Sequence, residues 1–183
     1  MNARDIVRTV MRDRYRRHLV IPNYTPPRWW ECDVFELTEA GYFREYEVKV
    51  SRPDFRADAD KRKWLWDERG SLASREKVAK HDLLDQRSPN GPTRFWYVTP
   101  AGLVAPDEVP PWAGLIQVSP HPRGYEGWQW ARLTEVVKAP QIHREPATEA
   151  VAKDARRTCY WRMHNAIVGT GTGIDDEPAE YVI

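Results

Sequence analysis

Two carboxylates and an ammonium group lie near one another in the sequence in a pattern that suits a metal site. Asp33 lies in one run rich in apolar residues, and Glu47 and Lys49 lie in the next such run. Mg²⁺ and Mn²⁺ take oxygen ligands, and such an ion contributes to catalysis by activating a bound water molecule. The three residue types therefore predict a hard-metal site with a cation beside it, provided that the fold brings the side chains together.

The surrounding residues predict a β-hairpin that would bring them together. Residues 31–38 and 42–50 are each typical of a strand, and Glu39-Ala40-Gly41 is typical of the turn between them. If the two strands pair with matching faces, the acid of the first strand meets the acid and the lysine of the second. The hairpin is thus the element that must position the site.

Two further acids would share the faces of these strands. Side chains alternate in direction along a strand, so Glu31 lies on the same face as Asp33, and Glu45 lies on the same face as Glu47 and Lys49. We therefore regard Glu31 and Glu45 as reserve ligands.

An acid on one strand followed by Glu-X-Lys on the next resembles the PD-(D/E)XK nuclease superfamily. The second motif is Glu47-Val48-Lys49, and Cys32 stands where the proline of the name would precede Asp33. Downstream, residues 94–103 and 109–116 look like the branch of small bacterial repair-type and phage-type proteins similar to MmcB. The resemblance covers roughly residues 25–120.

This resemblance implies a fold, a cofactor and a set of roles. The fold would be an α/β domain of restriction-endonuclease-like type, with a mixed β-sheet flanked by helices. Asp33 and Glu47, helped by the backbone carbonyl of Val48, would bind Mg²⁺ or Mn²⁺. Lys49 would orient the attacking water or stabilise charge on the phosphate. The expected activity is hydrolysis of phosphodiester bonds, of DNA in particular, in repair or in a phage or mobile-element context.

Basic residues before and after the hairpin are candidates for contacts with DNA. The first twenty residues are rich in arginine and have an apolar stripe at helical spacing, which predicts a helix that ends before Pro22. Its arginines either contact phosphate groups or form a solvated face. Further helices are expected over residues 56–69 and 74–86, and Asp54 is interpreted as part of a helix cap rather than as a ligand. The expected nucleic-acid contacts are Arg12, Arg16, Arg52, Lys61, Lys63 and Lys80.

The rest of the chain completes the expected fold. Strands are predicted over residues 94–99, 115–119 and 131–138, and a helix over residues 147–165. Residues 1–168 are predicted to form one domain, and residues 169–183 a flexible acidic tail. Residues 23–30 are expected to form an extended loop, whose Trp29 and Trp30 belong to the core.

Composition narrows the function classes. The net charge is +1, so any attraction for nucleic acid must be local, and two cysteines provide no disulfide framework. No apolar run approaches the ~20 residues that cross a bilayer, which predicts no membrane association and a place in the cytoplasm of a bacterial or phage-infected cell.

Two alternatives to the nuclease stay open. One is a catalytically silent nuclease fold that binds DNA or a partner; the other is an interaction protein, with the nine tryptophans supplying a binding face. A homodimer or a partner protein is compatible with each.

Overall fold

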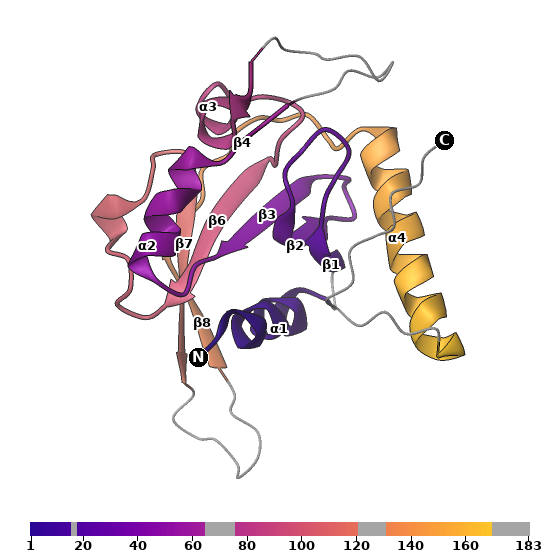
Figure 1. Cartoon of the computed structure of the whole chain (residues 1–183), viewed down its shortest axis with the longest axis horizontal. Coiled ribbons are helices and arrows are strands. Elements are labelled where there is room, and N and C mark those ends of the chain that lie inside the picture. Colours follow the sequence, from indigo (N-terminus) through magenta and orange to yellow (C-terminus); the bar gives the residue numbers. More distant parts are fainter. Residues whose placement is uncertain (16–17, 65–75, 121–130, 170–183) are drawn as a thin grey trace.

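The computed structural model describes residues 1–15, 18–64, 76–120 and 131–169, and these form an α/β fold around a mixed sheet (Figure 1). The sheet is six-stranded, in the order β1-β2-β3-β6-β7-β8. Neighbours are antiparallel from β1 to β3 and between β7 and β8, and parallel from β3 through β6 to β7. The predicted fold class, a mixed sheet flanked by helices, is confirmed. The strands are β1 (Leu19–Tyr24), β2 (Cys32–Leu37), β3 (Phe43–Val48), β6 (Arg94–Pro100), β7 (Ala113–Pro120) and β8 (Ala131–Val137).

Helices cover both faces of this sheet, and each face has its own core. On one face, Ile6 and Val10 of α1 (Ala3–Arg14) pack against side chains of β2, β3, β6 and β7. On the other face, Leu84 and the apolar side of the C-terminal helix pack against the opposite side chains of the same strands. The elements of this second face are α2 (Arg52–Ala57), the 3₁₀ turn η1 (Asp58–Asp60), α3 (Lys80–Asp85) and α4 (Glu149–Val168).

The predicted hairpin of β2 and β3 is confirmed, and its register sets the site. Val34 pairs with Tyr46 and Phe35 with Glu45. At the turn, Gly41 has φ +80°, a left-handed conformation that favours glycine, and its N–H donates to the carbonyl of Thr38 at 2.9 Å. The alternation expected from the sequence therefore holds on both strands.

The first helix is shorter than the sequence predicted. It begins with a capping box between Asn2 and Asp5 and ends at Arg14, whereas the expected helix ran on towards Pro22. Leu19–Tyr24 instead forms β1, a strand that the sequence analysis missed and partly assigned to a loop. Because β1 is at the edge of the sheet and pairs only with β2, the missing N–H of Pro22 is tolerated there.

The helices expected at 56–69 and 74–86 are also wrong in extent. The chain is helical only to Ala57, turns through η1, and forms a short β4 (Arg62–Lys63) that pairs with β5 (Val78–Ala79) ahead of α3. Asp58 is 1% exposed, and the chain turns there because its side chain is held in the interior by polar contacts. Part of each expected helix, residues 65–75, lies outside the described residues.

Several other expectations are confirmed. The strands β6, β7 and β8 and the helix α4 lie where the sequence predicted them, with ends that differ by a few residues. Trp29 and Trp30 are buried in the core, and Ser51 caps α2 by accepting from the N–H of Asp54 at 3.3 Å. Across the described ranges, none of the helices has the length and apolar character needed to cross a membrane. The expected tail, from residue 170 onward, lies outside the described residues.

Candidate functional site

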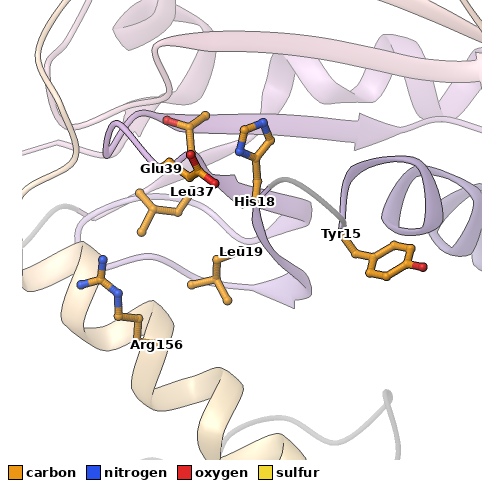
Figure 2. A pocket seen from close by; sticks show the side chains of 7 residues that line it. Tyr15, His18, Leu19, Leu37, Glu39 and Arg156 are labelled. Atoms are coloured by element: carbon orange, nitrogen blue, oxygen red, sulfur yellow. The ribbon is translucent and has the colours of Figure 1, made fainter.

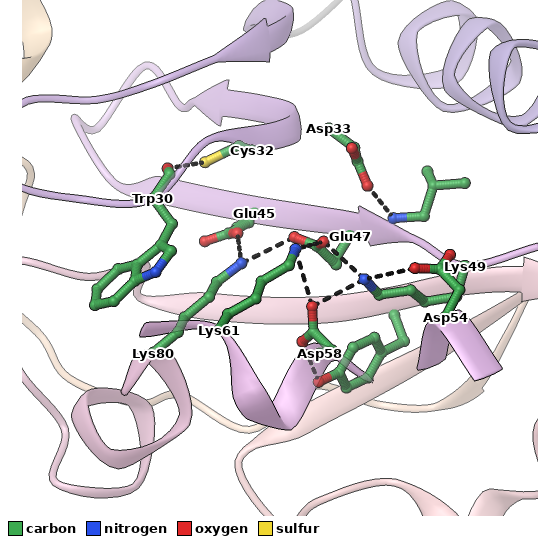
Figure 3. Close-up of polar contacts among 12 residues, drawn as sticks. Trp30, Cys32, Asp33, Glu45, Glu47, Lys49, Asp54, Asp58, Lys61 and Lys80 are labelled. Atoms are coloured by element: carbon green, nitrogen blue, oxygen red, sulfur yellow. Dashed lines mark hydrogen bonds and ion pairs between the residues drawn. The ribbon is translucent and has the colours of Figure 1, made fainter. Parts of the chain in front are cut away.

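The structure brings Asp33, Glu47 and Lys49 together on the face of the sheet that carries α2 and α3 (Figure 3). The register that pairs Val34 with Tyr46 places Asp33 beside Glu47. Asp33 Oδ2 accepts a hydrogen bond from the backbone N–H of Val48 at 2.7 Å, and Lys49 Nζ lies 3.0 Å from Glu47 Oε1. The start of β2 and the end of β3 therefore bring two carboxylates and one ammonium group together, and one of the carboxylates is already bonded to a backbone N–H of β3.

Both carboxylate oxygens of Glu47 are held by ammonium groups. Lys61 also contacts Oε1, and Lys80 lies 2.8 Å from Oε2. Lys80 further contacts Glu45 at 2.6 Å, and Glu45 in turn accepts from the indole N–H of Trp29 at 2.6 Å. Glu45 and Glu47 therefore share one face, as the alternation predicted.

Asp58 is the carboxylate that the sequence analysis missed. Its Oδ1 lies 2.8 Å from Lys49 Nζ and 3.0 Å from Lys61 Nζ. Its Oδ2 accepts from the hydroxyl of Tyr97 at 2.8 Å and lies 2.9 Å from Nε2 of His81. We refer to the following set as the Glu47 cluster: Asp33, Glu45, Glu47, Lys49, Asp58, Lys61 and Lys80.

His81 is a further residue that contacts Asp58. It lies in α3, its side chain is 20% exposed, and its ring is 3.0 Å from the hydroxyl of Tyr97. Asp58 stands one helical turn after Asp54, directly behind the strand of the Glu-X-Lys motif. Nothing in the sequence distinguishes it from an acid on a solvated helix.

Burial and neighbouring charges divide the carboxyl groups into two kinds. Burial raises the pKa of Asp33 to about 6, with a further contribution from the charge of Glu47. Burial raises the pKa of Glu45 to about 7, although Lys80 opposes the rise. Burial acts in the same direction on Glu47, but Lys80 and other ammonium groups outweigh it and its pKa is lowered. Glu47 is thus held as a carboxylate, whereas Asp33 and Glu45 take up protons more easily than carboxyl groups in water do.

The ammonium groups and Asp58 are held in their charged forms. Burial disfavours the charged form of Lys49, but Glu47 and Asp58 outweigh it and raise the pKa of Lys49. The pKa of Lys80 is raised well above its usual value in the same way, by Glu45 and Glu47 against its burial. Burial opposes ionisation of Asp58, yet the hydrogen bond from His81 and the nearby lysines hold its pKa well below the usual range.

Among the expected DNA contacts, Lys61 and Lys80 lie in the Glu47 cluster, but they differ in access. The Lys61 side chain is 35% exposed. Lys80 is fully buried between Glu45 and Glu47, so its expected contact with phosphate is wrong for this structure. Lys80 is instead the internal counter-ion of two carboxylates.

The other basic candidates lie outside the cluster. Lys63 contacts the carbonyl of Trp29, and burial lowers its pKa to about 8. Arg52 pairs with Glu108 and donates to the carbonyl of Leu103. Arg12 belongs to α1, on the opposite face of the sheet. Arg16 lies outside the described residues.

The two reserve ligands also separate. Glu45 is in the Glu47 cluster, as described above. Glu31 is exposed at the start of β2 and interacts electrostatically with Arg162 of α4. Only Glu45 therefore belongs to this site.

The donor set suits a hard cation in kind and in charge. Asp33, Glu47 and Asp58 supply carboxylate oxygens, and when all the acids of the Glu47 cluster are ionised they outnumber its ammonium groups. Within the described ranges, however, no three His, Cys, Asp or Glu side chains are arranged to hold a metal ion as they stand. Since both Glu47 oxygens are in ion pairs, a cation would have to replace an ammonium group there.

A surface hollow of about 290 Å³ lies elsewhere, between the end of α1, the hairpin turn and α4 (Figure 2). His18 and Glu39 lie on one side of it, and Arg156 approaches from α4. None of its lining residues belongs to the Glu47 cluster, so this hollow is not part of the candidate site.

Comparison with known proteins supports the fold alone. No protein-family model matches the chain, and no curated protein does either. Among solved structures, the chain is similar to the SPO1766 protein of unknown function from Silicibacter pomeroyi, with a TM-score of 0.60 and 18% identity. The match covers 93% of this chain and 94% of that one. A likeness at this identity concerns architecture, so function must be argued from the site.

Proposed function

We propose that the protein is a Mg²⁺- or Mn²⁺-dependent nuclease of PD-(D/E)XK type that hydrolyses phosphodiester bonds of DNA. The observation that supports this best is the convergence of Asp33, Glu47 and Lys49 at the ends of two adjacent strands. An acid on one strand and Glu-X-Lys on the next is the pattern that the superfamily resemblance requires. The proposed setting is repair, or a phage or mobile element, in the cytoplasm of a bacterial or phage-infected cell.

Each residue of the trio has a distinct task in this proposal. Asp33 and Glu47, with the carbonyl of Val48, would hold the cation, which when bound supplies an activated water and neutralises phosphate charge. Lys49 is 2% exposed and is fixed between Glu47 and Asp58, so its ammonium group is preorganised to stabilise negative charge on the scissile phosphate. Tyr97 and His81 hold Asp58 in position and thereby position Lys49.

A specific observation also favours a second candidate, a silent nuclease fold that binds DNA or a partner protein. Both oxygens of Glu47 are already neutralised by ammonium groups. A fold that had lost catalysis would need such internal counter-ions, because unpaired buried carboxylates are costly. In that case a second copy of the chain or another protein would be the functional partner.

One assay separates the two candidates. Plasmid, linear duplex and single-stranded DNA are incubated with the protein and Mg²⁺ or Mn²⁺, with EDTA in a parallel reaction. Cleavage that requires the metal and is abolished by Asp33→Asn supports the nuclease, since Asn keeps an acceptor for the N–H of Val48. DNA binding without cleavage by the wild-type protein would favour the silent fold.

A further inference from the structure

We propose that Lys61 is an exchangeable counter-ion, which holds the position of the divalent cation and must withdraw before that cation binds. The inference rests on the proposed function and adds a regulatory step to the same site. It also assigns to Lys61 a role that differs from a simple contact with the DNA backbone. Metal and lysine would compete for the same carboxylates.

The position of the Lys61 ammonium group supports this role. It contacts Glu47 Oε1 and lies 3.0 Å from Asp58 Oδ1, so one positive charge bridges two carboxylates from different elements (Figure 3). A divalent ion among these acids would make the same kind of bridge. Lys61 therefore provides, in the described structure, the charge that a bound cation would provide.

Burial distinguishes Lys61 from the other two ammonium groups on Glu47. The side chains of Lys49 and Lys80 are 3% and 0% exposed, whereas that of Lys61 is 35% exposed. Moving Lys80 would also leave the buried Glu45 without its ammonium partner, and Lys49, which bridges the same two carboxylates as Lys61, has almost no contact with water. Lys61 can swing into water and there regain its hydration, so it is the group that exchanges.

The backbone of Lys61 stays fixed during such an exchange. Its carbonyl accepts from the N–H of Lys80 at 3.0 Å, and its own N–H donates to the carbonyl of Asp58 at 3.2 Å. The next residue, Arg62, pairs with Ala79 in the ladder of β4 and β5. Only the flexible side chain moves, which keeps the ammonium group at the mouth of the site. Once released, it is free to contact a phosphate of the bound DNA.

The test is Mn²⁺ binding in the absence of DNA, measured by titration calorimetry on the wild type and on Lys61→Met. Met keeps the apolar stem and removes the competing charge, so the dissociation constant for Mn²⁺ should fall roughly fivefold, the size expected for loss of a partly exposed ion pair. Lys61→Gln, a second neutral variant, should act in the same direction. Arg62→Met is the matched control, because it removes an exposed cation from the neighbouring position and should leave the constant unchanged.

A second readout separates competition from a structural role. Without metal, Lys61→Met should lower the melting temperature, because two carboxylates lose a counter-ion. Saturating Mn²⁺ should restore it to the wild-type value or above, since the metal replaces the lost charge. A merely structural lysine would show no such rescue.

The outcomes are distinguishable. If the wild type binds Mn²⁺ and both neutral variants bind it no more tightly than Arg62→Met does, the role of Lys61 is wrong while the metal site stands. If neither the wild type nor the variants bind Mn²⁺, both the inference and the proposed nuclease fail.

Discussion

The two faces of the central strands bury glutamates whose polar partners differ in kind and in number. Under α1, Glu36 accepts from the hydroxyl of Tyr46 and from Arg44 at 2.9 Å, and His18 lies 3.4 Å away. We call these four residues the Glu36 network. On the other face, Glu47 is held by three ammonium groups and shares its surroundings with further acids.

This difference separates a structural polar network from a site suited to chemistry. The Glu36 network has one acid, whose oxygens are satisfied by a neutral and a charged donor, and it needs nothing more. In the Glu47 cluster the acids exceed the ammonium groups, and burial raises the pKa of Asp33 and of Glu45 to about 6 and 7. Perturbed carboxyl groups of this kind gather at functional sites.

The largest effect should come from removing the internal counter-ion of the site. Lys80→Met leaves Glu45 and Glu47 buried without their shared ammonium group, so the free energy of unfolding should fall by about 3–5 kcal/mol. Arg44→Met on the opposite face should cost only about 1 kcal/mol, because Arg44 is partly exposed and Tyr46 still donates to Glu36. Denaturant unfolding of the two variants measures the difference. Equal losses of unfolding free energy in the two variants would mean that the buried carboxylates of the Glu47 cluster depend on their counter-ion no more than Glu36 does.

A matched pair of isosteric changes tests function on the two faces. Glu47→Gln removes a proposed metal ligand, so cleavage of DNA should fall by on the order of 10²-fold or more. Glu36→Gln changes the same group at a similar depth on the other face and should leave the rate of cleavage unchanged. The measurement is initial rates with Mn²⁺, on proteins shown to be folded. Loss of activity in both variants would show that the assay reports stability and not the site.

The sequence could predict the part of the site that is formed by two strands adjacent in the chain. Asp33, Glu47 and Lys49 were placed correctly because the alternation of side chains and a hairpin turn suffice to bring them together. Asp58 and His81 could not be placed, since their positions depend on where the chain leaves α2 and returns into α3. Those turns are set by long-range contacts such as that from Tyr97, which local patterns do not contain.

The errors in the elements have a similar origin. An apolar stripe at helical spacing included Leu19, so the expected helix took in the first residues of β1, whose pairing with β2 is a tertiary interaction. The lysines of the later segment were interpreted as an exposed basic surface, yet Lys80 is an internal counter-ion. Charge in a sequence does not reveal burial when the compensating acids lie on another element.

The pH dependence of stability should report the raised pKa values of Asp33 and Glu45. Asp33 and Glu45 have pKa values of about 6 and 7 in the folded protein, against 3.8 and 4.5 as their ordinary values. Between pH 4 and 7 the folded state therefore binds more protons than the unfolded state, and stability falls as pH rises. Glu47 and Asp58, whose pKa values are lowered, act in the opposite direction below about pH 5.

Urea unfolding at several pH values measures this slope. Glu45→Gln should flatten it between pH 5 and 7, because the folded protein then loses its most easily protonated acid. A stability that rises over this range would contradict the assignment of the raised pKa values.

The smallest and sharpest comparison uses two buried tyrosines, one on each face. The hydroxyl of Tyr97 donates to Asp58, and that of Tyr46 donates to Glu36. Tyr97→Phe should cost only about 0.5–1 kcal/mol, because His81 and two lysines still satisfy Asp58, whereas Tyr46→Phe leaves Glu36 with Arg44 as its one close donor and should cost about 1–2 kcal/mol. Denaturant midpoints with equal m-values give both numbers. If Tyr97→Phe proved the costlier change, the lysines and His81 would not be the main partners that stabilise the Asp58 carboxylate, contrary to the account of the Glu47 cluster given above.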